Sequence, residues 1–167
     1  MVILGIDPGL AIVGWGVLDY DKNRFRPLAY GSINTPAGME TAARLALIHR
    51  DLATIIERYK PTQMAVEELF FTKNITTGIR VAEARGVILM TGQEKGLSLA
   101  EYTPMQVKQA VVGYGGADKR QVISMVTRLL SLPEPPKPDD TADALAIAIC
   151  HAHSGCSRLG GFYNRMQ

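Results

Sequence analysis

Residues 2–9 read VILGIDPG, and this stretch decides the fold because it places an acid directly after a buried strand. A short apolar run of this kind, bounded by turn residues, predicts a strand in the core. Asp7 closes the run, and a carboxylate at the rim of a buried strand is costly to ionise unless a cation is close. Pro8 and Gly9 also form a good turn sequence, in which Asp7 would simply cap the turn. Asp7 is therefore either a turn cap or part of a cation site.

The chain first shows the patterns of three strands and then alternates between helix and strand. The predicted strands are 2–7, 12–20, 27–34, 63–67 and 97–102. The predicted helices are 39–59, 75–94, 104–112, 118–130 and 140–153. Short turns between the first three strands favour an antiparallel meander. We therefore predict an α/β fold, a five-stranded mixed sheet with helices on both faces, in one domain of residues 1–154 with a flexible C-terminal tail at 155–167.

Composition restricts the class of protein more than it identifies a function. The chain has 167 residues with 47% hydrophobic and 20% charged residues, which is typical of one globular domain. A net charge of +2 permits a nucleic-acid partner but does not indicate one. The sequence predicts no membrane span and no signal peptide. Cys150 and Cys156 fit neither a disulfide framework nor a metal clip, so we expect reduced thiols in a cytoplasmic protein.

Two further segments place acids at the edge of a core element. Glu67 and Glu68 close the fourth strand, and Asp139, Asp140 and Asp143 open the last helix. The spacing of three between Asp140 and Asp143 puts both on one helix face. Together with the acid after the first strand, these segments suggest one shared cation site. Ligands that are all oxygen favour Mg²⁺ or Mn²⁺, and two such ions are the usual apparatus of phosphodiester cleavage.

Each of these acids also has an ordinary explanation. The proline before Asp139 suggests that this residue is the N-cap of the last helix. Asp140 and Asp143 would complement the helix dipole in the first turn, and Glu68 would be solvated. The three segments taken together are harder to explain in this way, because carboxylates within a few Å repel one another and raise one another's pKa.

Basic residues flank the segments where the acids would meet. They are Lys73, Arg80, Arg85, Lys108, Lys119, Arg120 and Arg128. A solvated helix face is the default interpretation, and a surface for the phosphate backbone is the alternative. Lys108 and Lys119 are also candidates to neutralise charge that develops on a scissile phosphate.

Aromatic and imidazole side chains give weaker signals. Phe70 and Phe71 follow the glutamate pair, and they predict either a plug in the core or a wedge that stacks on an unpaired base. His151 and His153 fall near the end of the last predicted helix, and we interpret both as surface or tail residues.

Several motifs occur in a fixed order along nearly the whole chain. They are GIDPG at 5–9, GWG at 14–16, VEELF at 66–70 with Lys73 and Asn74, ARG at 84–86, QVK at 106–108, VVG at 111–113 and DTADALA at 140–146. From residue 2 to about residue 153 the sequence resembles the RuvC family of bacterial Holliday-junction resolvases. One short motif alone would be weak, but the ordered set is specific.

The resemblance implies an RNase H-like fold and a homodimer that nicks four-way junctions in pairs. It also implies two Mg²⁺ ions per active site, for which Mn²⁺ substitutes, and the branch-migration proteins RuvA and RuvB as partners in the bacterial cytoplasm. The family's catalytic and metal-binding carboxylates fall on Asp7, Glu67, Asp140 and Asp143. Its functional aromatic and basic positions fall on Phe70, Lys108 and Lys119. The helix with Ala82 and Gly86 corresponds to its dimer-forming helix.

Three other classes share part of these signals. A YqgF-type nuclease has the same fold and a similar opening, but the longer motifs argue against it. An ATP-binding protein of the actin and sugar-kinase type needs further glycine-rich phosphate loops and a longer chain, and the glycines at 113–116 are isolated. A non-catalytic junction binder would not need four acids in one place.

Overall fold

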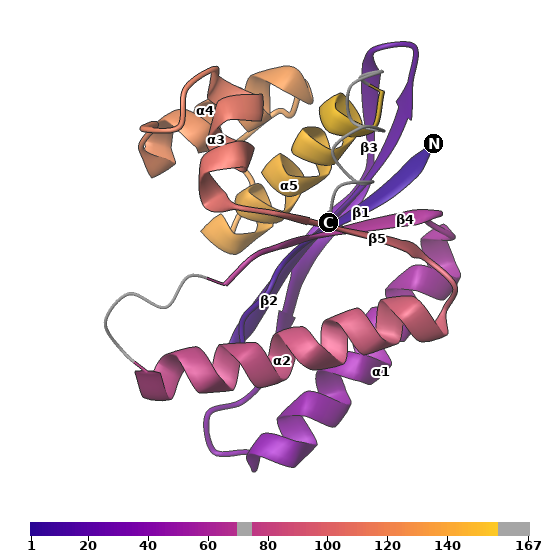
Figure 1. The fold of residues 1–167 in the computed structure, drawn as a ribbon, viewed down its shortest axis with the longest axis vertical. Coiled ribbons are helices and arrows are strands. Elements are labelled where there is room, and N and C mark those ends of the chain that lie inside the picture. Colours follow the sequence, from indigo (N-terminus) through magenta and orange to yellow (C-terminus); the bar gives the residue numbers. More distant parts are fainter. Residues whose placement is uncertain (70–74, 157–167) are drawn as a thin grey trace, which may run out of the picture.

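The protein folds as one mixed sheet with helices on both faces, as Figure 1 shows. The structure is a computed structural model, and it describes residues 1–69 and 75–156. The strands are β1 (Val2–Asp7), β2 (Ile12–Asp21), β3 (Arg24–Asn34), β4 (Gln63–Glu67) and β5 (Ser98–Tyr102). The helices are α1 (Thr41–Tyr59), α2 (Ile75–Glu94), α3 (Pro104–Val112), α4 (Lys119–Leu129) and α5 (Asp139–Cys156).

The sheet has the strand order β3-β2-β1-β4-β5. The first three strands pair antiparallel, while β4 and β5 run parallel to β1 and to each other. This arrangement confirms the predicted mixed sheet. The prediction that the third strand begins at residue 27 was wrong, because β3 begins at Arg24. Lys22 and Asn23 both have positive φ, 45° and 64°, which is the backbone of a tight hairpin turn that lets pairing continue to the turn.

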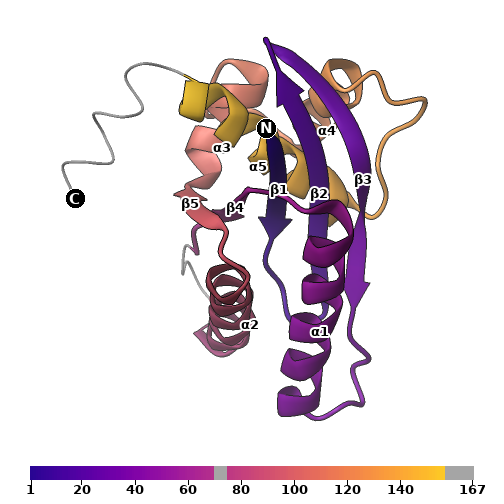
Figure 2. The same cartoon turned by 90° about the vertical axis from the view of Figure 1, so that its right-hand side faces the viewer.

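The two faces of the sheet are covered by different helices, as the turned view in Figure 2 shows. Leu4 and Ile6 of β1 belong to the core that α1 and α2 cover, whereas Ile3 belongs to the core that α5 covers. Successive side chains of a strand point to opposite faces. Asp7 therefore lies on the same face as Ile3, under α5.

Helix α5 lies directly against β1 and β2 because two glycines make room for it. A Cβ atom at Gly5 would collide with the backbone carbonyl of Ala144, and one at Gly14 with that of Asp140. The buried hydroxyl of Thr141 donates to the carbonyl of Gly31 at 3.1 Å and ties the first turn of the helix to β3. These contacts fix where the N-terminus of α5 lies relative to the end of β1.

The ends of α5 differ from the prediction. The helix begins at Asp139, so this residue is the first helical residue and not the cap before it. The amide N–H of Thr141 donates to the carbonyl of Pro138 at 3.0 Å, which brings the helical turn forward by one residue. The helix continues to Cys156, three residues beyond the predicted end. Most of the predicted tail, residues 157–167, lies outside the described residues.

The expectation that His151 is a surface residue was wrong. Its side chain is buried, because α5 continues over the sheet at this point. Nδ1 lies 2.8 Å from the hydroxyl of Tyr102, and Nε2 lies 2.7 Å from Oε1 of Gln63. His153 is exposed as expected, with its ring edge-on to Phe25.

Two further observations concern a cysteine and the length of the helices. Cys150 is a free and buried thiol. Within residues 1–69 and 75–156, no helix combines the length and the apolar character needed to cross a membrane.

Candidate active site

The acids meet where three elements converge. Asp7 ends β1 and Glu67 ends β4, and these strands are parallel neighbours whose carboxyl ends lie at the same edge of the sheet. Glu67 follows Ala65 on the face that α5 covers. The N-terminal part of α5 adds Asp140 and Asp143 at that edge. Glu68 lies beyond the end of β4, and its amide N–H donates to the carbonyl of Tyr102 at 2.9 Å.

Asp7 has the most perturbed carboxyl group in the site. Burial, together with the charges of Glu67, Asp143 and Asp140, raises its pKa to about 8 against a smaller opposing effect of Lys119. A carboxyl group with this pKa is protonated through much of the neutral range unless a cation approaches. The position after a buried strand, which the sequence shows, is the physical cause of the shift.

Glu67 and Asp143 are perturbed in the same direction. Burial and the charge of Asp143 raise the pKa of Glu67 to about 7, while Lys108 and Lys119 lower it. Burial also raises the pKa of Asp143, although the charge of Lys119 opposes this effect. Acids on β1, β4 and α5 are thus close enough to influence one another's ionisation.

Two lysines approach the acids from the helices that follow β5. Lys119 is the first residue of α4, whose N-terminus is set by a capping box between Asp118 and Gln121. Its Nζ lies 3.2 Å from Oδ2 of Asp143 and 3.6 Å from Oδ2 of Asp139. Lys108 comes from α3, which begins with a second capping box after β5.

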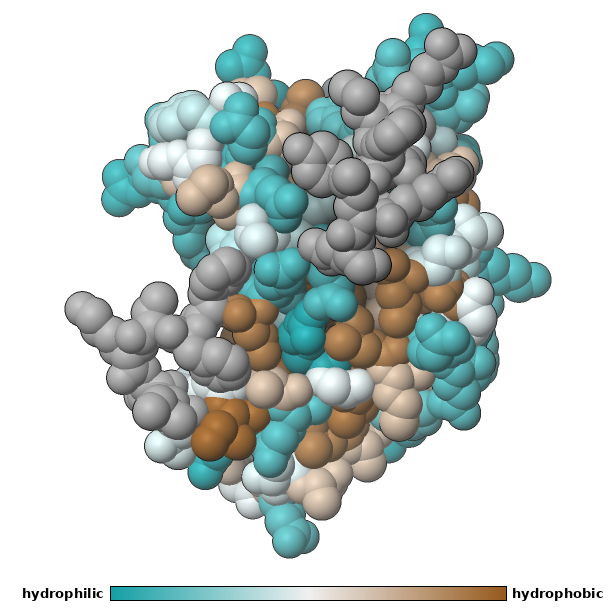
Figure 3. Space-filling view, in the orientation of Figure 1, coloured by the Kyte–Doolittle hydropathy of each residue, from teal (hydrophilic) through white to brown (hydrophobic). Residues whose placement is uncertain are grey.

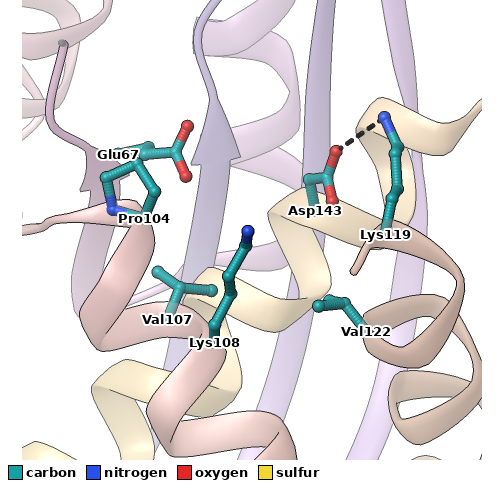
Figure 4. A pocket seen from close by; sticks show the side chains of 7 residues that line it. All are labelled: Glu67, Pro104, Val107, Lys108, Lys119, Val122 and Asp143. Carbon is teal, nitrogen blue, oxygen red and sulfur yellow. Dashed lines mark ion pairs between the residues drawn. The ribbon is translucent and has the colours of Figure 1, made fainter. Parts of the chain in front are cut away.

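A cavity of about 220 Å³ lies among these acids and lysines. Glu67, Asp143, Lys108 and Lys119 line it, and three apolar residues complete its wall. Figure 4 shows the carboxylate of Glu67 and the ammonium group of Lys108 directed into the space, with Lys119 paired to Asp143. The apolar residues are Pro104, Val107 and Val122. Because its wall carries both ammonium and carboxylate groups, the cavity is suited to an anionic group that the lysines contact directly and that a cation links to the acids.

The donor set fits a hard divalent cation by its chemistry. All four acids offer oxygen atoms only, and burial together with mutual repulsion raises the pKa of three of them. Within residues 1–69 and 75–156, no three such side chains converge closely enough to hold an ion as they stand. Lys119 is the cation paired with Asp143 in this arrangement.

The structure brings together six of the seven predicted site residues and leaves one undescribed. Phe70 lies outside the described residues, so its predicted contact with a junction stays a prediction. Arg85, which we expected in a basic surface for phosphates, has another environment. Its Nε donates to the backbone carbonyl of Glu67 at 3.2 Å, and its guanidinium group pairs with Glu101.

The sequence analysis did not single out Arg44, a residue near the site. Arg44 of α1 is buried, and its Nε donates to the hydroxyl of Thr35 at 2.7 Å. That hydroxyl donates in turn to the carbonyl of Leu10 and so fixes the loop after Asp7. An arginine on the apolar face of an amphipathic helix is the signal that would have indicated a buried partner.

The fold and the acid cluster define the class: an RNase H-like α/β protein with carboxylates at the ends of two parallel strands and a helix. Among solved structures, T. thermophilus RuvC in complex with Holliday junction substrate has a TM-score of 0.86 and 37% sequence identity. The alignment covers 99% of this chain and 96% of that one.

Sequence comparisons define the family. The family "Crossover junction endodeoxyribonuclease RuvC" matches residues 3–151. The protein of that name from Halothermothrix orenii is 59% identical over 92% of this chain and 93% of its own length. That from Heliobacterium modesticaldum is 60% identical over 92% of this chain and 95% of its own. The chain therefore belongs to the RuvC family of crossover junction endodeoxyribonucleases.

Proposed function

We propose that this protein is a metal-dependent endonuclease that resolves four-way DNA junctions by paired, symmetrical nicks. The observation that carries the proposal is the mutual perturbation of acids from three segments, with a pKa of about 8 for Asp7 and about 7 for Glu67. Strongly perturbed groups that share a cleft are typical of reacting sites. The family assignment supplies the class of reaction, and the family member solved with Holliday junction substrate supports the choice of DNA.

In this proposal Asp7, Glu67, Asp140 and Asp143 hold two Mg²⁺ ions, and Mn²⁺ substitutes for them. Such ions, when bound, supply activated water and stabilise the leaving oxygen of a phosphodiester. The chain's own contribution is to hold four acids at one edge of the sheet and to exclude water from Asp7 by burial. Lys108 and Lys119 line the cavity beside the acids and stabilise the charge of the scissile phosphate.

The path of the DNA is suggested by a second hollow of about 470 Å³ on the other side of Asp140. It is lined by the loop after β1 and by the first turns of α2, including the exposed side chain of Arg80. Arg80 and the two lysines of the first cavity therefore flank the acids on both sides. This arrangement suits a phosphate backbone that passes over the acid cluster.

A homodimer through α2 is part of the proposal. Ile79 and Met90 are 53% and 54% exposed, and Gly86 on the same helix has open space beside it. Figure 3 shows hydrophobic side chains gathered on the part of the surface where α2 runs. A two-fold dimer would present two sites to a two-fold junction, which accounts for paired nicks. By family resemblance we also propose RuvA and RuvB as partners and the cytoplasm as the location.

The test is cleavage of a labelled four-way junction by the wild type and by Asp7→Asn, with and without Mg²⁺. We expect symmetrical nicks from the wild type with Mg²⁺ only, and a loss of roughly 10³-fold or more in the variant with junction binding retained. A linear duplex of the same sequence serves as the control substrate. Normal nicking by Asp7→Asn, or equal cleavage of the linear duplex, would contradict the proposal.

A further inference from the structure

The backbone carbonyl of Glu67 lies just past the end of the pairing between β1 and β4. The register runs from Ile3 opposite Gln63 to Ile6 opposite Val66. Beyond Ile6 the first strand continues only to Asp7 and then reaches Pro8, which has no N–H to donate. Pro8 therefore cannot donate a hydrogen bond to the carbonyl of Glu67. The side chain of this same residue enters the acid cluster.

Arg85 of α2 supplies the missing donor. Its Nε donates to the carbonyl oxygen of Glu67 at 3.2 Å, and its guanidinium group forms an ion pair with Glu101 of β5. The side chain of Arg85 is only 18% exposed. Its helical neighbours Ala84 and Ile88 are fully buried against the sheet, so the position of Arg85 relative to β4 is fixed by packing.

The peptide group between Glu67 and Glu68 is thus held on both sides. Its carbonyl accepts from Arg85, and its N–H donates to the carbonyl of Tyr102 at 2.9 Å. Tyr102 directly follows Glu101, the residue that holds Arg85. The contacts form a closed ring from Glu67 through Arg85, Glu101 and Tyr102 back to Glu68, immediately before residues 70–74.

We propose that Arg85 and Glu101 are positioning residues that keep the carboxylate of Glu67 in register with the other three acids. This inference rests on the proposed function. Arg85 acts through the backbone of Glu67, and its planar fork lets it donate to a carbonyl and a carboxylate at the same time. A displacement of about 1 Å of a catalytic group is enough to lower a rate by roughly 10²-fold.

A purely structural tie between α2 and β5 is the competing explanation. Such a tie would affect the unfolding temperature, but it would leave the turnover of the folded enzyme and the peptide group of Glu67 unchanged. The positioning role predicts a change in both. Junction binding, which depends on the wider basic surface, separates a misplaced carboxylate from a damaged DNA surface.

The test uses Arg85→Lys and Glu101→Gln in the full chain, with Arg50→Gln as the matched control. Arg50 also forms an arginine–carboxylate pair, with Asp51, but on the exposed side of α1. Lysine keeps the charge at position 85 but cannot bridge both partners with one fork. We expect Arg85→Lys to lower turnover at saturating junction about 10- to 100-fold with the junction Kd within about threefold. We expect a smaller loss for Glu101→Gln and none for Arg50→Gln.

Two further measurements do not depend on catalysis. The backbone amide signal of Glu68 in an ¹⁵N spectrum should shift in Arg85→Lys, because the hydrogen bond to the preceding carbonyl polarises that peptide group. Calorimetric titration with Mn²⁺ should show several-fold weaker binding to this variant. Wild-type turnover in Arg85→Lys together with an unshifted Glu68 signal would overturn the inference. A wild type that fails to cut junctions would instead overturn the proposed function, while the signal and the titration still decide the role of Arg85.

Discussion

A polar cluster lies at each end of helix α5, and the two clusters are built on opposite principles. At its N-terminus, the charges of Glu67 and Asp143 help to raise the pKa of Asp7, and the charge of Asp143 helps to raise the pKa of Glu67. At its C-terminus, both ring nitrogens of His151 have partners, Tyr102 and Gln63, at 2.8 and 2.7 Å. One cluster is destabilised by like charge, and the other is neutral and fully hydrogen-bonded.

The difference teaches how to separate a functional polar cluster from a structural one. In the described part of the chain, no buried side-chain nitrogen or oxygen lacks a hydrogen-bond partner. The acid end is therefore distinguished by charge and not by unpaired atoms. A neutral, satisfied network stabilises the fold, whereas several acids in a low-dielectric edge need a cation that the fold itself only partly supplies through Lys119.

The largest effect on cleavage should come from replacing one acid of the cluster at the N-terminus of α5, with the neighbouring residue as the control. Glu67→Gln removes a carboxylate from the cluster, and we expect junction cleavage to fall by roughly 10³-fold. Glu68→Gln changes the next residue, which lies beyond the end of β4 and outside the cavity. We expect its cleavage rate to stay within about threefold of the wild type. Single-turnover assays on a labelled four-way junction measure both, and equal losses in the two variants would contradict the assignment of Glu67.

A smaller effect, on stability alone, should come from replacing His151 in the cluster at the C-terminus of α5. His151→Ala leaves Tyr102 and Gln63 without their partner and opens a cavity, and we expect a loss of about 2 kcal/mol, roughly 4–8 °C in Tm. The exposed His153→Ala is the matched control and should change Tm little. Cleavage below the unfolding transition should persist in both variants. A His151→Ala protein with wild-type Tm would show that the network contributes nothing.

The pKa of His151 predicts how the stability of the protein changes with pH. Burial lowers the pKa of His151 below its ordinary value of 6.5. Below that pH the unfolded chain takes up a proton that the native imidazole does not, so stability falls as the pH falls through about 6.5. This acid-side loss should be absent from His151→Ala.

Much of this fold could be predicted from the sequence because its elements carry strong local signals. The apolar run of β1, the proline at the start of α3 and the acid pair opening α5 each fix an element without tertiary information. The motif order also predicted which acids lie near one another at the ends of β1 and β4 and at the start of α5. Those signals are local, so they can be recognised in the sequence without knowledge of the packing.

The parts that could not be predicted depend on partners from distant segments. His151 is buried because α5 packs over β4 and β5, where Gln63 and Tyr102 form hydrogen bonds with it. The role of Arg85 depends on where the pairing of β1 with β4 stops, which a helical pattern around residue 85 does not contain. The early start of β3 depends on a hairpin turn in which Lys22 adopts a positive φ. Lysine, unlike glycine, does not indicate such a backbone conformation in a sequence.

The most direct test of the central claim is the stability of the metal-free protein between pH 5 and pH 9. The pKa of Asp7, raised to about 8 from an ordinary 3.8, means that the native state keeps a proton that the unfolded chain releases. Protonation of Asp7 therefore supports the fold at pH 5, and this support is lost as the pH rises towards 8. We expect metal-free Asp7→Asn to exceed the wild type in Tm at pH 8 by about 5 °C, and Mg²⁺ to stabilise the wild type more than the variant. A wild type as stable as Asp7→Asn at pH 8, with the same pH slope and no response to Mg²⁺, would contradict it.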